Sequence, residues 1–220
     1  AIRYCLRNPD VFLDQLRAIL RASAHGNVKV MFPMVSGVGE LVRAKECLST
    51  AKRQLRESET SFDEEIQVGC MIETPSAVTI CDMLATEVNF FSIGTNDLVQ
   101  YLLAVDRINN EIAYLYEPHH PAVIRSMKRV FDVAREKKVG VTVCGEIAGD
   151  PHFLPLLLAL GEGSLSAASP MLPELKFFAR RFSMTEAVEL LERVFRMTRP
   201  SEINQTLKDF YEERVSDLVS

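Results

Sequence analysis

The sequence predicts an α/β fold built on a parallel sheet. Strand-like apolar runs recur five times along the 220 residues, and each is followed by a stretch with helical spacing. This alternation is typical of βα units, because parallel strands need a crossover connection that is usually a helix. Polar residues come directly after three of the apolar runs, and α/β proteins bind ligands at those strand ends.

The first predicted helix begins near Asn8, which can cap it, because Pro9 suits the first helical position. Gly26 is expected to end it. Further helices are predicted at 37–57 and 121–138, where apolar residues form one stripe. The five predicted strands lie at 28–32, 67–72, 88–93, 139–143 and 164–168.

Only helices are predicted after Pro170, at 171–182, 184–197 and 201–217. Five βα units fit two architectures: a doubly wound open sheet, or the last five units of a TIM (β/α)8 barrel, which needs eight strands and usually about 250 residues. On the second interpretation, residues 1–220 form a single partial barrel domain. Residues from about 170 to 220 are then its C-terminal helical part, which closes or flanks the barrel.

Composition excludes several classes of function. The formal net charge of −5 gives no sign of a nucleic-acid surface, which needs a basic face. No apolar run reaches the roughly 18 residues that suggest a membrane span. The first ten residues lack the layout of a secretion signal, and the five cysteines show no metal-binding spacing. These features predict a cytoplasmic protein.

Two acidic residues follow consecutive predicted strands, Glu73 after 67–72 and Asp97 after 88–93. Neighbouring strands lie about 4.8 Å apart, so both carboxylates can reach one hard cation. Mg²⁺ fits best, because it takes one or two protein carboxylates and leaves its other positions to water and substrate oxygens. The alternative is that each acid only caps the helix that follows.

Phosphate-binding groups are predicted near the same strand ends. Gly94 allows close backbone approach, and the amides of 95–97 can donate to phosphate at a helix start. A tight turn alone would explain this segment equally. Arg107 can hold phosphate through its guanidinium fork, or it can form a surface salt bridge with Asp106 or Glu111.

Cys144 ends the fourth predicted strand and is followed by Gly145, which predicts a sulfur at the mouth of the sheet. Cysteine thiols are mostly protonated at neutral pH, so this one is a possible acid towards an enolate. The alternative is a buried, inert thiol. His119 and His120 lie in a Pro-flanked loop and are interpreted as cap or loop residues.

Four segments occur together in this order: MIETP at 71–75, FSIGTNDLVQ at 91–100, AVDR at 104–107 and CGE at 144–146. Taken together, they resemble the Enzyme I family of the bacterial sugar phosphotransferase system, and the similarity runs along essentially the whole chain. In that resemblance, the stretch that contains GTNDL is specific to enzymes that use phosphoenolpyruvate (PEP), and the segment after it is closest to Enzyme I.

The resemblance implies an eight-stranded barrel that binds PEP with Mg²⁺, passes the phosphoryl group to a histidine on a separate domain, and releases pyruvate. Position by position, it implies that Glu73 and Asp97 bind Mg²⁺. Asn96, Asp97 and Arg107 would hold the substrate, and Cys144 would protonate the enolpyruvate carbon. It also implies a cytoplasmic homodimer that works with a phosphocarrier protein in sugar transport.

The family has further arginine ligands and three strands before the position of Ala1, together with the phosphohistidine domain. The chain is therefore expected to be part of a longer phosphotransferase and to be inactive alone. One alternative is a barrel of the pyruvate phosphate dikinase or PEP synthase type. The other is a non-catalytic module that serves dimerisation or regulation.

Overall fold

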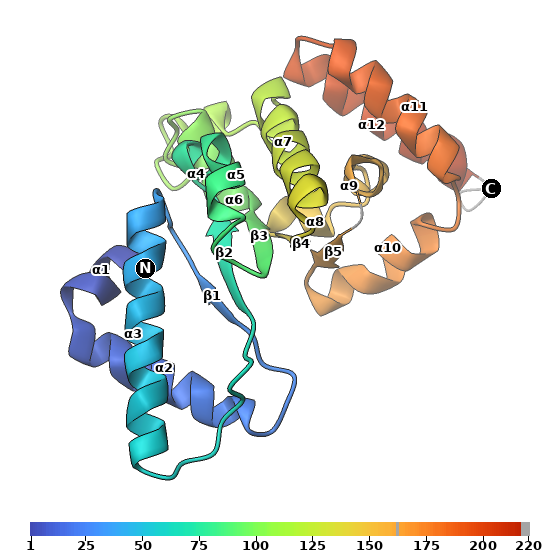
Figure 1. The fold of residues 1–220 in the computed structure, drawn as a ribbon. Helices are drawn as coiled ribbons and strands as arrows, with labels where there is room; N and C mark the ends of the chain where they lie inside the picture. The colour runs from blue at the N-terminus through green and yellow to red at the C-terminus, as the bar shows by residue number, and fades with distance from the viewer. Residues whose placement is uncertain (162, 217–220) are drawn as a thin grey trace.

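A computed structural model describes residues 1–161 and 163–216 of the chain. Figure 1 shows one parallel sheet with helices around it, and all five predicted strands are present. The strands are β1 (Val30–Phe32), β2 (Val68–Ile72), β3 (Phe90–Gly94), β4 (Gly140–Cys144) and β5 (Ser164–Ser166). The α/β class predicted from the sequence is therefore confirmed.

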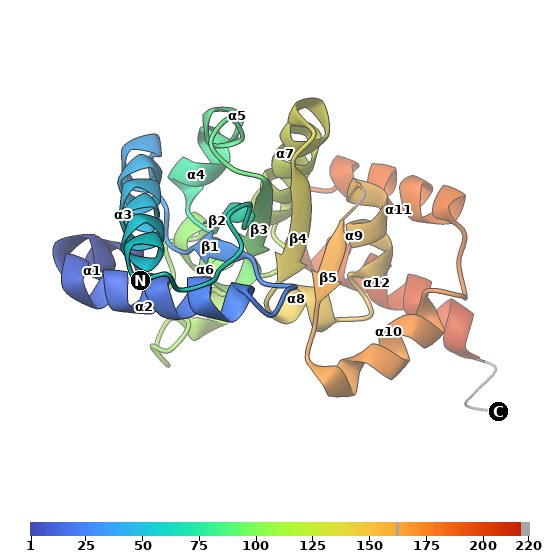
Figure 2. The same ribbon diagram turned by 60° about the horizontal axis from the view of Figure 1, so that its bottom comes forward.

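The strands lie side by side in the order in which they occur in the chain, β1-β2-β3-β4-β5. A doubly wound sheet reverses its strand order at a switch point, and this sheet has no such reversal. The doubly wound alternative is therefore wrong. Figure 2 shows the connecting helices α3 (Val38–Glu57), α5 (Cys81–Leu84) and α7 (Pro121–Lys137) along one side of the strands.

The pleat of the sheet separates a covered face from a more open one. Phe91 pairs with Cys70 and Val141, and all three are buried. The next residue, Ser92, pairs with Met71 and Thr142, both only partly buried. Successive side chains of a strand point to opposite faces. One face is therefore packed core, while the other carries polar and partly accessible side chains.

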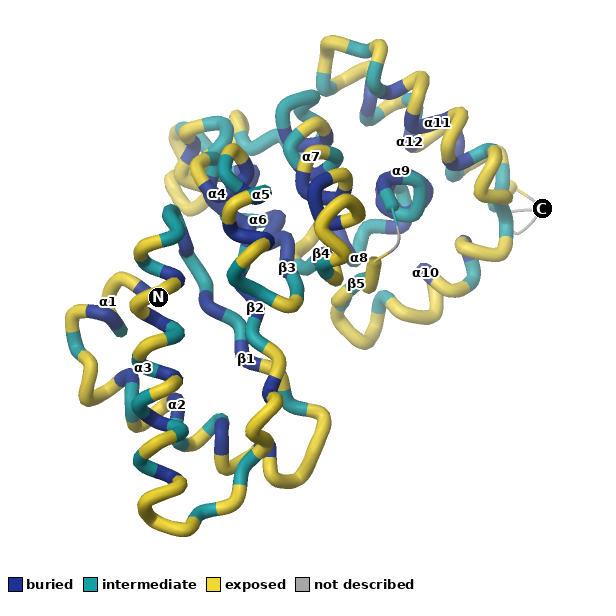
Figure 3. Tube along the Cα trace, viewed as in Figure 1, coloured by how far each residue is buried: buried dark blue, intermediate teal, exposed yellow. Residues whose placement is uncertain are grey.

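Figure 3 shows buried residues concentrated along the strands and the inner sides of α7 and α11, with exposed residues prominent on α2 and α10. Helix α2 (Pro9–Ser23) packs its Phe12 ring edge-on against Phe32 of β1, with ring centroids 6.0 Å apart. No helix in residues 1–161 and 163–216 is long and apolar enough to cross a membrane.

Several element boundaries differ from the predictions. A short helix, α1 (Ile2–Arg7), precedes the first predicted one. Asn8 does not cap α2 through its side chain, because its amide donates instead to the Tyr4 carbonyl at 2.9 Å, closing α1. The connection after β2 is two short helices, α4 (Pro75–Thr79) and α5, and β3 leads into α6 (Thr95–Leu102) and the 3-10 turn η1 (Ala113–Leu115).

The C-terminal region is helical as predicted, although α10 is shorter than expected and residue 217 of the predicted last helix lies outside the described residues. The short helices α8 (Glu146–Gly149) and α9 (Leu154–Leu160) both precede β5 in the chain. After β5 come the 3-10 turn η2 (Ser169–Met171), α10 (Leu172–Phe178), α11 (Met184–Arg196) and α12 (Pro200–Val215).

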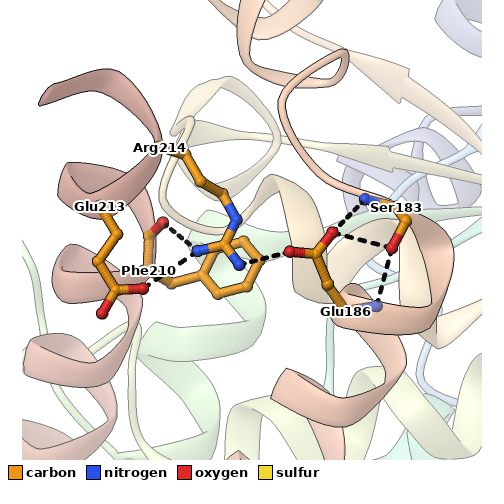
Figure 4. A network of polar contacts seen from close by, with 5 residues as sticks. All are labelled: Ser183, Glu186, Phe210, Glu213 and Arg214. Carbon is orange, nitrogen blue, oxygen red and sulfur yellow. Dashed lines mark hydrogen bonds and ion pairs between the residues drawn. The ribbon is translucent and has the colours of Figure 1, made fainter. Parts of the chain in front are cut away.

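A polar network joins the last two helices (Figure 4). Ser183 and Glu186 form a reciprocal capping box at the start of α11. Arg214 of α12 donates to Glu186 Oε1 at 2.7 Å, and its guanidinium lies 3.5 Å from the centre of the Phe210 ring. The network therefore caps the start of α11, pairs the Glu186 carboxylate with Arg214, and packs the Arg214 guanidinium against an aromatic ring.

Candidate functional site

Glu73 lies immediately beyond β2, where the chain turns into α4. Its side chain is almost fully buried, and Oε1 accepts a hydrogen bond of 2.6 Å from the Met34 N–H. Met34 follows β1 and has a positive φ of 55°, an unfavourable conformation for a residue with a Cβ. The turn after β1 is thus held in a strained conformation that directs an amide at this carboxylate.

Asp97 approaches Glu73 from the first turn of α6, which starts as soon as β3 ends. Burial raises the pKa of the Glu73 carboxyl, and the nearby Asp97 raises it further through its negative charge and a side-chain hydrogen bond. The Met34 N–H opposes this rise, because it stabilises the charged carboxylate. Two carboxylates have therefore been brought together, as predicted, on adjacent strand ends.

Asn96 joins the ends of β3 and β4. Its Oδ1 accepts from the Glu146 N–H at 2.9 Å, and its Nδ2 donates to Glu146 Oε1 at 3.4 Å. The approach depends on Gly145, whose φ is +97° and whose added Cβ would clash with Thr95 Oγ1 and lie 2.8 Å from Asn96 Oδ1. A glycine is required here, because it leaves room for the asparagine and tolerates this backbone conformation.

Cys144 is the last residue of β4 and pairs with Gly94 and Ser166. Its partly buried sulfur lies 3.3 Å from the Ile93 carbonyl oxygen and 3.4 Å from Ser92 Oγ. The same residue lines a cavity of about 910 Å³ together with Asn96 and Glu146. The thiol is therefore held by β3, in a residue that borders the cavity.

Arg107 lies in the exposed segment between α6 and η1, where its N–H donates to Gln100 Oε1 at 3.2 Å. Within the described part of the chain, no ion pair joins it to Asp106 or Glu111. Burial and the Glu146 carboxylate raise the pKa of the nearby Tyr116, and the charge of the Arg107 guanidinium opposes this rise. The surface salt-bridge alternative is therefore wrong.

The residues present suit a hard divalent cation at Glu73 and Asp97. No group of three or more His, Cys, Asp or Glu side chains able to hold a metal occurs among the residues that the structure describes. Mg²⁺ does not require one, since two carboxylates, water and substrate oxygens complete its shell. Asp97 raises the proton affinity of Glu73, and a cation stabilises a carboxylate pair of this kind.

Comparison with known proteins identifies the family of this chain. The family model described as "PEP-utilising enzyme, PEP-binding domain" matches residues 1–184. The chain belongs to the PEP-utilising enzyme family. Its PEP-binding domain thus includes every strand and all the strand-end residues described above, while α12 and nearly all of α11 lie beyond the matched region.

Relatives of this PEP-binding domain carry the name phosphoenolpyruvate-protein phosphotransferase. The relative from Geobacillus stearothermophilus is 44% identical over 212 residues, covering 94% of this chain and 36% of its own length. The relative from Haemophilus influenzae is 43% identical over 210 residues, covering 96% and 36%. The chain therefore spans a little over a third of the length of the relatives it matches.

Solved structures share the fold at low sequence identity. A citrate lyase from Burkholderia xenovorans LB400 superimposes with a TM-score of 0.52 at 15% identity, covering 94% of this chain and 68% of that one. At this identity the likeness concerns the fold alone.

Sequence reasoning missed several parts of this PEP-binding domain's site. Met34 supplies an amide from a different strand end, the Tyr116 hydroxyl donates to the Asn96 carbonyl, and Glu146 is the partner of the Asn96 side chain. Ser92, whose Oγ contacts the Cys144 sulfur, could have been predicted from the sequence. It is the polar residue between the apolar Phe91 and Ile93 in a strand that ends at the site. Tyr116 gave no signal, because it lies twenty residues from Asn96 in an irregular segment.

Proposed function

We propose that this domain binds PEP with Mg²⁺ and presents its phosphoryl group to a histidine on a separate domain, with pyruvate as the second product. The observation that carries the proposal is the paired carboxylates of Glu73 and Asp97 beside Asn96 on adjacent strand ends. The relatives' name supports the same reaction and favours it over the dikinase and synthase alternative.

Glu73 and Asp97 would hold Mg²⁺, which when bound neutralises charge on the phosphate and carboxylate of PEP. Glu73 is oriented for this task by the Met34 N–H, and Asp97 by the first turn of α6. The Asn96 side-chain amide and the Asp97 backbone N–H would donate to substrate oxygens, with the Asn96 amide fixed by Glu146. Arg107 would form paired hydrogen bonds with the phosphate, as guanidinium groups do.

Cys144 would complete the reaction as the acid. When the P–O bond of PEP breaks and the new P–N bond to histidine forms, the enolate of pyruvate is left behind. The thiol donates its proton to the terminal carbon of this enolate, giving the methyl group of pyruvate, and water reprotonates the thiolate. The contact of its sulfur with the Ile93 carbonyl and the position of the residue beside the cavity support this role.

We further propose that the sheet is an arc of an eight-stranded barrel in the whole protein. The outer strands β1 and β5 each pair on one side only among the described residues, and such edges are unfavourable unless covered. A homodimer in the cytoplasm, a phosphohistidine domain and a phosphocarrier for sugar transport would complete the system. The exposed apolar side chains of Ile108, Tyr114 and Leu115 suit a subunit contact.

The test is calorimetric titration of the chain with PEP, with and without Mg²⁺. Binding is expected to require Mg²⁺, and Glu73→Ala or Asp97→Ala is expected to abolish it. Glu65→Ala is the control, since Glu65 is exposed at the opposite end of β2. Tight, Mg²⁺-independent binding by both site variants would overturn the metal assignment.

A further inference from the structure

Ser92 lies on β3, two residues before the strand ends at Gly94. Only 6% of the residue is exposed, although most serines in proteins are in contact with water. A buried hydroxyl needs a hydrogen-bond partner, and Ser92 Oγ lies 3.4 Å from the sulfur of Cys144 on the neighbouring strand β4. The two residues are 52 positions apart in the chain, so the parallel pairing of β3 with β4 creates this contact.

The two contacts of the Cys144 sulfur fix the direction of this hydrogen bond. The sulfur also lies 3.3 Å from the Ile93 carbonyl oxygen, which can only accept. A thiol has one proton, so the Cys144 S–H donates to this carbonyl. The Ser92 hydroxyl is then the group that donates to the sulfur. One strand therefore supplies both an acceptor for the thiol proton and a donor for the sulfur atom.

These two contacts change in opposite ways when the thiol gives its proton to the terminal carbon of the enolate. The S–H bond breaks, a C–H bond forms, and the electron pair of the S–H bond stays on the sulfur as a thiolate. The hydrogen bond to the Ile93 carbonyl is then lost, because neither atom carries a proton. The hydrogen bond from Ser92 becomes charge-assisted and therefore stronger. An interaction that strengthens as the reaction proceeds accelerates that step.

We propose that Ser92 is a positioning residue, which holds the Cys144 sulfur at the end of β4 and stabilises the thiolate that remains when the proton is transferred. This inference rests on the proposed function, since the proton transfer is the step that Cys144 carries there. The burial of Ser92 supports the role, because a donor that is already fixed needs no reorganisation during the reaction. Ser92 acts through the sulfur and is not itself the acid.

Alkylation of Cys144 by iodoacetamide, which consumes the thiolate, tests the contact without substrate. Ser92→Ala is expected to lower the thiolate population about tenfold, because one hydrogen bond to a charged group is lost. The greater nucleophilicity of the remaining thiolate recovers about threefold, so the alkylation rate at neutral pH should fall roughly threefold. Mass spectrometry of the peptide that contains Cys144 measures this rate. Ser164→Ala is the matched control, because Ser164 is an exposed serine at the start of β5 in the same sheet.

The direction of the change in alkylation rate separates this role from a purely structural one. If Ser92 only filled space, its truncation would loosen the strand end and leave the sulfur equally reactive or more reactive. An alkylation rate that is unchanged or higher in Ser92→Ala than in the wild type would therefore overturn the inference.

A second experiment measures the chemical step in a full-length phosphotransferase carrying this domain. Ser92→Ala should slow pyruvate formation roughly tenfold and leave the dissociation constant for PEP with Mg²⁺ unchanged, because the hydrogen bond strengthens only after the substrate has bound. In a Cys144→Ala background, the same substitution should have no further effect, and additive losses would contradict the positioning role. If Cys144→Ala alone leaves pyruvate formation unchanged, the proposed acid fails instead, and the alkylation rates still decide whether Ser92 acts on the sulfur.

Discussion

Two glutamates in different regions of the molecule have pKa values shifted in opposite directions. Glu186, in the C-terminal helices, accepts from the Ser183 N–H and from Arg214, and these contacts lower its pKa to about 2. Glu73, at the end of β2, is buried beside a second carboxylate, and its pKa is raised. The first carboxylate stabilises the fold as a charged group, and the second opposes it.

The difference separates a region in which a charged group stabilises the fold from one in which a charged group is unfavourable. The Glu186 carboxylate accepts from the Ser183 N–H, from the Ser183 hydroxyl and from the Arg214 guanidinium, and each of these contacts favours its charged form. Around Glu73, burial and Asp97 outweigh the single amide of Met34. Carboxylates forced together in this way are typical of sites that await a cation or a proton.

The largest expected effect would confirm that the strand ends serve chemistry. In a full-length phosphotransferase carrying this domain, Cys144→Ala should lower pyruvate formation by at least ~100-fold, because the acid is lost. Phosphoryl transfer to histidine should persist. Pyruvate production and phosphohistidine are measured separately, with Cys5→Ala on α1 as the control; unchanged pyruvate formation would remove Cys144 from the mechanism.

A substitution of the glycine after β4 tests whether the backbone conformation there requires a residue without a Cβ. Gly145→Ala should destabilise the chain by about 3 kcal/mol, since a Cβ there is strained by the backbone and clashes with Thr95. Gly39→Ala in α3 is the control, because a Cβ meets nothing within 4 Å and alanine favours helices. Urea unfolding measures both variants. Equal stabilities would show that the turn after β4 tolerates a side chain.

The polar network between α11 and α12 allows a substitution that changes stability and leaves PEP binding unaltered. Glu186→Gln should lower the free energy of unfolding by about 1 kcal/mol at pH 7, because its side chain is 41% exposed and solvent screens the ion pair. PEP binding should not change. Glu189→Gln on the same helix, exposed and outside the network, is the control.

The pH dependence of this variant follows from the lowered pKa. The stabilisation is complete above the ordinary glutamate value of about 4.3 and is lost as the pH falls to about 2. The wild type and Glu186→Gln should therefore converge in acid. A difference that stays constant from pH 7 to pH 2 would contradict the network's role.

The smallest effect has the opposite sign. Glu73→Gln should raise the free energy of unfolding by roughly 0.5–1 kcal/mol without Mg²⁺, because the folded state no longer holds a buried charge beside Asp97. The gain should grow as the pH rises above about 4.3, where the wild-type carboxyl must ionise in both states.

With Mg²⁺ present, the wild type should become more stable than Glu73→Gln, because a ligand that binds only the folded state stabilises it. Thermal unfolding with and without Mg²⁺ at pH 5 and pH 8 measures both effects. A wild type that is more stable than Glu73→Gln without Mg²⁺ would remove the contrast between the two glutamates.

The five parallel strands, the helical C-terminal region and the strand-end positions of Glu73, Asn96, Asp97 and Cys144 all followed from the sequence. Apolar runs and helical stripes are local, so periodicity reveals them without knowledge of the fold. Periodicity does not distinguish a doubly wound sheet from part of a barrel, because both consist of βα units. Only the strand order, which depends on pairing between distant segments, excluded the doubly wound sheet.

The partners of the site residues needed the tertiary structure. The Met34 amide meets Glu73 across 39 positions of the chain, and Glu146 meets Asn96 across 50. No ion pair joins Arg107 to Asp106 or Glu111 in the part of the chain that the structure describes, although both acids lie beside it in the sequence. The sequence specifies which groups carry the charge, whereas packing decides which of them face one another. That decision depends on the summed contacts of whole helices and strands.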